Sequence, residues 1–404
     1  MKLSTFFSLF FVIFLFSCKK DKENGNAGDF NAAPIIPHIK IDIDNGDEVV
    51  QKSVYLSADI TIDGKNNYES YSGRTEIRGR GNTSWGMPKK PYRIKLETAA
   101  PLFGLTAHKS WILLAEYLDG SMLYNSIPFE VAKMLDIPYT NNIIPVELTI
   151  NGQYRGLYAF TEHKEVKPGR IDVGNDGLLL ELDSYFDEDW QFKSAEFDLP
   201  VMIDYPEDMT TAKLAAIKNE FESFEALVAD PSFPNNNYLD YFDDLSFVNY
   251  LIVYKLTQNR EISHPKSTYI NKLAGGKYRM GIIWDFDWAF GYSASGQHYD
   301  VSSANISIFT DNLPGTNFFR KFMDDPHIQG LFKDRWNWFK ANKLEDLKKH
   351  VKSYAALVGQ AMEADHEVWG PRNSSGDIHV DLNNALTWLD ARVNFIDSYV
   401  ATFE

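Results

Sequence analysis

Two aspartates, Asp285 and Asp287, stand one residue apart in the aromatic stretch GIIWDFDWAFG at 281–291. Read as a β-strand, this stretch places both carboxylates on one face and three aromatic side chains on the other. Two carboxylates on an apolar strand repel each other and lose solvation, which is costly unless a cation lies between them. Mg²⁺ or Mn²⁺, bound through one or two carboxylates and substrate phosphates, would supply that cation. A structural, ion-paired role for the two aspartates is the alternative.

A second group of residues has the chemistry to bind an anion. Six cationic residues lie between Arg78 and Lys95, around a glycine-rich loop with an expected strand on each side. Glycines let backbone N–H groups approach an anion closely, while arginine offers forked donors and lysine a point charge. Arg93 and Lys95 alternate with apolar residues and so share one strand face. Phosphate binding is one interpretation, and a solvated hairpin whose cations pair with the chain's many acids is the other.

The overall composition limits the kinds of partner. The chain has 404 residues, a formal net charge of −16 and 14% aromatic residues. This length suffices for one large or two medium domains with a sizeable core. So acidic a chain, without an extended basic face, is not expected to bind nucleic acid.

The first 17 residues read as a lipoprotein signal peptide. An apolar run at 6–16 follows Lys2, is too short to span a bilayer and leads into Leu-Phe-Ser-Cys, which looks like a bacterial lipobox. Cleavage before Cys18, the chain's only cysteine, would leave it to carry the lipid, and residues 18–34 would form a flexible tether. We therefore expect an envelope protein held in the outer membrane only by its anchor, with export tags of the Bacteroidetes kind suggesting surface exposure. An ordinary secretory signal with an incidental cysteine is the alternative.

The elements that would position these groups follow from hydrophobic periodicity. Alternating apolar residues predict strands in the first half of the chain, and apolar residues at helical spacing predict helices in the second half. Within one apolar strand Glu181 would need a partner, because an unpaired buried carboxylate is costly. Strands are expected at 39–43, 54–62, on both sides of the basic loop, and at 111–114, 146–150, 154–158 and 178–182. Helices are expected from near Asp119, at 211–227 and 245–256, and over most of 318–403.

Four sequence blocks together resemble the CotH kinase family, which is distantly similar to secretory-pathway protein kinases. The blocks occur in family order across residues 74–291, and a looser similarity extends from residue 35 to the C-terminus. They are RGRGNTSWGMPKKPYRIKL, WILLAEYLDGSMLYNSIPFEVA, VELTINGQYRGLYAFTEHKE and IIWDFDWAFG.

The resemblance implies an α+β, kinase-like architecture over residues 35–404. A β-rich N-terminal part would cover about 35–205, a mainly helical C-terminal part about 206–404, and a cleft would lie between them. The implied activity is metal-dependent phosphoryl transfer from a nucleotide to a serine or threonine hydroxyl of a protein acceptor. The implied cofactor is ATP with Mg²⁺ or Mn²⁺.

Residue roles follow from the same resemblance. Arg78, Lys90 and Lys95 would hold the nucleotide phosphates, with Lys89 as the alternative to Lys90. Glu162 would lie near the nucleotide pocket, where it could pair with a phosphate-binding lysine as in kinases. Asp285, helped by Asp287, would bind the metal ion.

This chain departs from the family pattern at two positions. Glu261 stands where the family has a catalytic aspartate, and Ser267 stands on or near a metal-binding asparagine. Glu261 could still take the proton of the acceptor hydroxyl, although its extra methylene moves the carboxylate by about 1 Å. A serine hydroxyl is a poorer metal ligand than an amide carbonyl.

Two alternative functions remain open. The first is an inactive kinase-like module that binds glycan or protein at the cell surface, where no ATP supply is obvious. The second is a glycosyltransferase that uses Asp-x-Asp with a sugar nucleotide.

Overall fold

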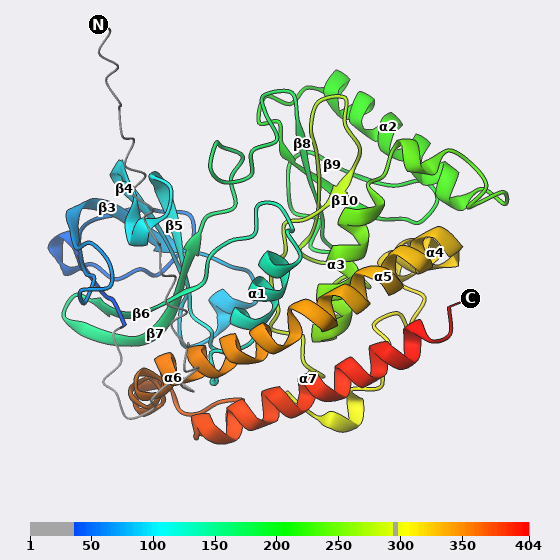
Figure 1. Ribbon diagram of the computed structural model, residues 1–404. Coiled ribbons are helices and arrows are strands. Elements are labelled where there is room, and N and C mark those ends of the chain that lie inside the picture. Colours follow the sequence, from blue (N-terminus) through cyan, green and yellow to red (C-terminus); the bar gives the residue numbers. More distant parts are fainter. Residues whose placement is uncertain (1–35, 294–297, 404) are drawn as a thin grey trace, which may run out of the picture.

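Seven strands close into a barrel in the N-terminal half of the computed structural model, which describes residues 36–293 and 298–403 (Figure 1). The strand order is β1-β2-β3-β4-β5-β7-β6, and β1 closes the barrel by pairing in parallel with β6. Their bounds are β1 His38–Ile43, β2 Leu56–Asp63, β3 Tyr71–Gly79, β4 Tyr92–Ala100, β5 His108–Leu114, β6 Ile144–Ile150 and β7 Gln153–Glu162.

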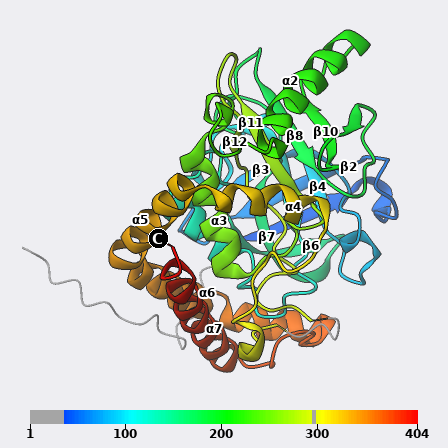
Figure 2. The ribbon, with the colours of Figure 1, turned by 90° about the vertical axis from the view of Figure 1, so that its right-hand side faces the viewer.

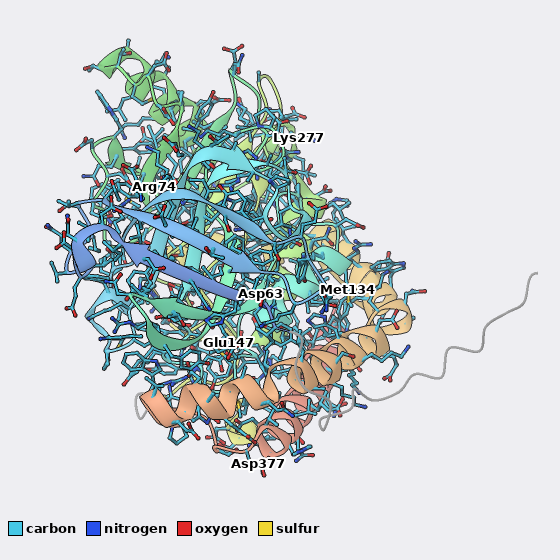
Figure 3. All side chains as sticks on the ribbon, turned by 90° about the vertical axis from the view of Figure 1, so that its left-hand side faces the viewer. Asp63, Arg74, Met134, Glu147, Lys277 and Asp377 are labelled. Carbon is cyan, nitrogen blue, oxygen red and sulfur yellow. The ribbon has the colours of Figure 1, made fainter. Side chains whose placement is uncertain are left out.

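Alternation along the strands fills the barrel. Ile39, Ile41 and Ile43 of β1 are buried, as the sequence predicts, and the two residues between them are exposed. Charged side chains occupy the outer face, where Arg74 lies 2.7 Å from Asp44 and 3.1 Å from Asp59 (Figure 3).

A second, antiparallel sheet lies beyond the barrel in the order β12-β11-β8-β10-β9. It takes three strands from before residue 206 and two from after it, so it spans the expected boundary between the two parts. Its strands are β8 Leu178–Leu182, β9 Gln191–Lys193, β10 Pro200–Tyr205, β11 Thr268–Lys272 and β12 Arg279–Met280.

The C-terminal half is mainly helical, as expected. α3 is buried on nearly all sides and lies between the second sheet and the α6–α7 pair (Figure 2). The α-helices are α1 Ser126–Met134, α2 Thr211–Ala229, α3 Asp244–Thr257, α4 Pro314–Lys321, α5 Pro326–Asn342, α6 Leu344–Trp369 and α7 Ile378–Val400. Short 3₁₀ helices occupy Asp44–Gly46, Ser84–Gly86, Leu102–Gly104, Tyr238–Asp240, Val301–Ser303 and Phe322–Asp324.

None of the described helices is long and apolar enough to cross a membrane. The expected signal peptide, Cys18 and the tether lie outside the described residues.

Two of the predicted elements are wrong. The helix expected from near Asp119 begins only at Ser126, because the buried carboxylate of Asp119 holds residues 119–124 in turns by accepting hydrogen bonds from Ser121 and Tyr124. No strand forms at 281–291, because the preceding strand β12 ends at Met280. Asp285 has φ of +60°, which no strand accommodates.

A buried ion pair joins the barrel to α6, which packs against β7 (Figure 1). Lys89 Nζ lies 2.5 Å from Asp365 Oδ1, and both side chains are 0% exposed. Asp365 also accepts a hydrogen bond from the backbone N–H of Leu157 on β7, at 2.9 Å. The side chain of Lys89 therefore has a structural role in holding α6 against the barrel.

α3 carries a second buried lysine, Lys255, which makes no ion pair with any residue that the structure describes. Its Nζ lies 4.0 Å from the ring centroid of Tyr399 and 5.3 Å from that of Phe309. Burial, together with the nearby Arg392, lowers the pKa of Lys255 to about 7. The protonated form is thus disfavoured in the fold.

Replacing Lys255 with methionine is expected to stabilise the protein in a pH-dependent way. The ordinary pKa of lysine lies near 10.4, so the unfolded chain binds more protons between about pH 7 and pH 10, and wild-type stability rises with pH there. Below pH 7 the full cost of burying the protonated Lys255 is present. Removing this cost outweighs the lost cation–π contact by about 2 kcal/mol.

Urea unfolding at pH 6 and pH 10 measures this effect. The gain for K255M should shrink toward zero at the higher pH, and the exposed control K352M should show no such trend. A gain for K255M that is equal at both pH values would contradict the explanation.

Candidate active site

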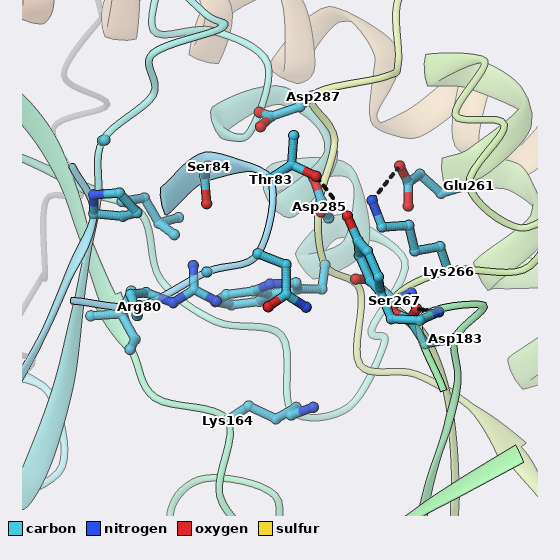
Figure 4. Close-up of a pocket in the computed structure, with 18 of the residues that line it drawn as sticks. Arg80, Thr83, Ser84, Lys164, Asp183, Glu261, Lys266, Ser267, Asp285 and Asp287 are labelled. Carbon is cyan, nitrogen blue, oxygen red and sulfur yellow. Dashed lines mark hydrogen bonds and ion pairs between the residues drawn. The ribbon is translucent and has the colours of Figure 1, made fainter. Parts of the chain in front are cut away.

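A cavity of about 410 Å³ lies where the barrel, the second sheet and the segment after β12 meet (Figure 4). It brings together residues that are far apart in the sequence. The barrel side of the cavity includes Arg78, Arg80–Ser84, Arg93 and Ala115–Leu118. Its floor is formed by His163, Lys164, Glu181 and Met202. Its far side is formed by Asp183, Glu261, Lys266, Ser267, Asp285 and Asp287.

Three arginines line the barrel side of the cavity. Arg78 of β3 and Arg93 of β4 are directly opposite in the strand pairing, and the buried Nε of each has no hydrogen-bond partner among the described residues. Arg80 lies over the ring of Trp284, 5.7 Å from its centroid, and makes no ion pair with a described residue. Burial lowers the pKa of Arg80, while Asp285 opposes this shift. Arg78 Nη1 donates to the Lys52 carbonyl and Arg93 Nη2 lies 3.4 Å from Ser110 Oγ, so each of these two arginines keeps its Nε as an unused donor.

Glu261 provides an unused acceptor on the far side. Its side chain is 1% exposed, with Oε1 3.9 Å from Lys266 Nζ and Oε2 unpartnered among the described residues (Figure 4). Burial raises the pKa of Glu261 well above its usual range, and Asp285 adds to this while Lys266 opposes it. A buried carboxylate with a free oxygen can accept a proton from a bound group.

Asn259 links this glutamate to the aspartates. Its Oδ1 accepts from the backbone N–H of Glu261 at 3.0 Å, and its Nδ2 donates to the backbone carbonyl of Asp285 at 2.8 Å. Burial raises the pKa of Asp287 well above its usual range, with Asp285 and Glu116 adding to the shift. Asp285 and Asp287 therefore lie in one negative region although they are not on a strand.

Ser267 lies next to an acid that sequence reasoning did not select. The backbone N–H of Ser267 donates to Asp183 Oδ2 at 3.1 Å, and Ser267 has a left-handed φ of +45°. Asp183 also accepts from the backbone N–H of Tyr185 at 2.7 Å. The stretch from Asp183 to Lys193 is rich in acids, but nothing in its sequence singles out Asp183.

Lys164 forms an ion-paired network on the floor of the cavity. Its Nζ lies 2.5 Å from Glu181 Oε2, 2.8 Å from Asp204 Oδ2 and 3.0 Å from the Tyr269 hydroxyl. Burial acts to lower the pKa of Lys164, but Asp204 and Glu181 raise it well above its usual range. The partner that the sequence required for Glu181 is therefore Lys164.

Four residues with predicted phosphate or nucleotide roles are not among the lining residues. Lys90 Nζ donates to the Trp85 carbonyl at 2.7 Å, and the exposed Lys95 lies 3.9 Å from Glu76. Lys89 is buried against α6, as described above.

Glu162, the fourth, lies on another cavity. It accepts hydrogen bonds from the backbone and side-chain nitrogens of Asn142 at 2.8 and 2.7 Å. It lines a separate cavity of about 270 Å³, which shares His163 with the first.

Within residues 36–293 and 298–403, no three Asp, Glu, His or Cys side chains are arranged to hold a metal ion together. Magnesium is commonly held by one or two carboxylates with substrate phosphates and water, which this cavity's pairs of carboxylates suit.

Comparison with known proteins identifies a family for most of the chain. A family model described as CotH kinase protein matches residues 77–396, from β3 of the barrel to α7. No curated protein matches the chain.

Proposed function

Because the chain belongs to the CotH kinase family, we propose that its cavity transfers a phosphoryl group from a nucleotide to a hydroxyl of a protein acceptor. The observation that carries the proposal is that, among the described residues, the cavity is lined both by arginines with an unpartnered Nε, Arg78 and Arg93, and by Glu261, which has an unpartnered carboxylate oxygen. Phosphoryl transfer needs this pairing, since it depends mainly on positioning and charge neutralisation. We further propose that the protein acts in the bacterial envelope, anchored through Cys18.

Arg78, Arg80 and Arg93 hold the nucleotide phosphates in this proposal. The free Nε atoms of Arg78 and Arg93 support it, because a buried donor without a partner is costly unless a ligand accepts from it. These arginines replace Lys90 and Lys95, whose side chains point to other partners. Lys164, paired with Glu181, takes the place of the kinase lysine–glutamate pair.

Asp285 and Asp287 hold the divalent cation, with Ser267 at the edge of the site. Asp287 is half-buried and Asp285 repels its carboxylate, which supports the assignment because a cation would relieve this repulsion. A bound Mg²⁺ or Mn²⁺ would neutralise charge on the transferred phosphoryl group. Asn259 fixes the backbone of Asp285, so the carboxylate of Asp285 is positioned before metal and substrate bind.

Glu261 accepts the proton of the acceptor hydroxyl through its free Oε2. Its raised pKa makes it a stronger base than an exposed carboxylate. Lys266, 3.9 Å away, favours the charged form of Glu261 and so opposes the rise of its pKa.

The experiment is incubation of the full chain with γ-labelled ATP, Mn²⁺ and casein as a hydroxyl-bearing acceptor. Label in protein, together with thermal stabilisation by Mn²⁺ and ATP, supports the kinase. Stabilisation by a UDP-sugar instead would indicate a glycosyltransferase.

One observation favours the second candidate, a non-catalytic binding module. Trp288 at the cavity is 39% exposed and is stacked on Tyr292 with an interplanar angle of 8°. Exposed aromatic surface often marks a binding site. The absence of any nucleotide-dependent shift in the same assay would favour this function.

Replacing Arg80 with alanine is expected to weaken nucleotide binding by about 10- to 100-fold, because a charge-assisted hydrogen bond contributes about 1.5–3 kcal/mol. The matched control is K95A, which removes a cation that lies outside the cavity and should bind nucleotide as the wild type does. Titration of ATP against the thermal midpoint with Mn²⁺ measures both. Weakened binding in K95A but not in R80A would reverse the assignment.

A further inference from the structure

The cavity of about 270 Å³ that contains Glu162, which we call the second cavity, lies near the start of β5 and β6 and the end of β7. We infer that it binds a small molecule that carries both a carboxylate and an amino group, the chemistry of a free amino acid. Arg170 holds the carboxylate and Glu162 the ammonium group. Among the described residues, the linings of the two cavities have His163 in common and are otherwise separate.

Arg170 contributes an unused edge of its guanidinium group to the second cavity. Its side chain is 2% exposed, and the guanidinium lies over the ring of Trp111, 4.7 Å from the centroid. Nη1 donates to the carbonyl of His163 at 3.1 Å and to the carboxylate of Glu165. Nε and Nη2 are buried and have no hydrogen-bond partner among the described residues.

The two free nitrogens specify the group that Arg170 can bind. Nε and Nη2 lie on one edge of the planar guanidinium, and their parallel N–H bonds match the two oxygens of a carboxylate. A buried donor without an acceptor is costly, so a carboxylate bound at this edge would remove that cost.

Glu162 provides a negative charge on the same cavity. Its oxygens accept hydrogen bonds from the backbone and side-chain nitrogens of Asn142 at 2.8 and 2.7 Å, and the Thr161 hydroxyl lies 3.4 Å from Oε2. All three donors are uncharged, and Glu162 makes no ion pair with a described residue. A carboxylate has about four acceptor sites, so Glu162 can still accept from an ammonium group.

Trp111 brings these two groups together. It is paired with Glu162 across β5 and β7, and residues paired in this way have Cβ atoms about 4.5–5.5 Å apart. Its ring is the one that Arg170 covers, and Arg170 also donates to the carbonyl of His163, the residue after Glu162. The two opposite charges are therefore neighbours, yet no ion pair of the described residues joins them.

This arrangement of charges selects the ligand. A molecule with a carboxylate alone would be attracted by Arg170 and repelled by Glu162. An amino acid places one group of the matching charge at each residue, so it neutralises both.

The turn that carries Arg170 is held in place by the surrounding chain. His108 Nε2 donates to the carbonyl of Pro168 at 3.1 Å. Gly169 has φ of +75°, and a Cβ atom there would lie 2.6 Å from Cγ2 of Thr106, so the turn packs closely against this segment. A ligand of Arg170 therefore does not have to order the turn, which favours binding.

The test is isothermal titration calorimetry of the full chain at pH 7 with glycine, β-alanine and 4-aminobutyrate, in which the amino group lies progressively further from the carboxylate. Acetate and methylamine present the two groups singly. We expect at least one of the three amino acids to bind at least about tenfold more tightly than acetate and methylamine do, because both of its charged groups gain charge-assisted hydrogen bonds.

Variants assign the two ends of the ligand. R170K keeps the positive charge but removes the forked donors, and should weaken binding of that amino acid by at least about tenfold. R320K makes the same change at an exposed residue of α4, outside the lining of both cavities, and should bind as the wild type does. E162Q should bind the amino acid no more tightly than acetate.

The inference fails if none of the three amino acids binds, or if acetate binds as tightly as all of them, which would indicate a simple anion site. Binding that R170K leaves unchanged would also overturn it. Should R170K fail to fold, E162Q decides, because an unchanged preference for the amino acid over acetate would equally overturn the inference. None of these outcomes involves label transfer from ATP, so the proposed function stands or fails separately.

Discussion

Replacing Asp285 with asparagine is expected to lower phosphoryl transfer by about 10³-fold, the effect typical of removing a preorganised charge from the site of transfer. The fold should survive, because asparagine tolerates the left-handed φ of +60° at this position. The Asn259 contact is to the backbone carbonyl and remains. The loss would therefore be chemical rather than structural.

Initial rates of label transfer from ATP in Mn²⁺ measure this effect, with the thermal midpoint recorded for each variant. The matched control is D189N, which makes the same chemical change at an exposed residue outside the cavity lining. A D285N protein that folds and retains more than about a tenth of wild-type activity would remove Asp285 from the mechanism.

Replacing Asp365 with asparagine is expected to lower the free energy of unfolding by about 3–5 kcal/mol, because it leaves the buried Lys89 charge without its counter-ion. The backbone N–H of Leu157 and the guanidinium of Arg372 lose the same carboxylate. An ammonium group that is 0% exposed cannot recover this loss from water.

Urea unfolding at pH 7 measures the effect. D390N is the control, since it breaks an ion pair with Lys348 that is 2.7 Å long but largely exposed on the aspartate side, and should cost less than about 1 kcal/mol. Equal losses in the two variants would show that the buried pair contributes no more than a surface pair.

Much of the fold can be predicted from the sequence because local pattern and tertiary packing agree. The expected helices at 211–227 and 245–256 match α2 and α3 to within two residues at each end. The turn at Asn151–Gly152 joins β6 to β7 as an Asn-Gly pair predicts. The strand predicted at 281–291 does not form, because the alternating pattern of the sequence does not match how its side chains pack. Phe286 is buried, whereas Trp288, on the same face of the predicted strand, is exposed.

The types of residue in the candidate site could be predicted, but not which of several neighbours would be used. Arg93 and Lys95 share a face of β4, yet two residues advance a strand by about 6.5 Å, which takes Lys95 past the cavity. The role of Lys89 depends on Asp365, which is 276 residues away in the sequence. A contact at that separation leaves no local pattern.

The central place of β8 in the second sheet affects how the chain can be synthesised. β8 pairs with β10 on one side and β11 on the other, and β11 leaves the ribosome only after α2 and α3. Until then one edge of β8 is open to strands of other molecules, the usual route to aggregation. Termination or proteolysis before Thr268 would therefore yield an aggregation-prone fragment instead of a smaller folded protein.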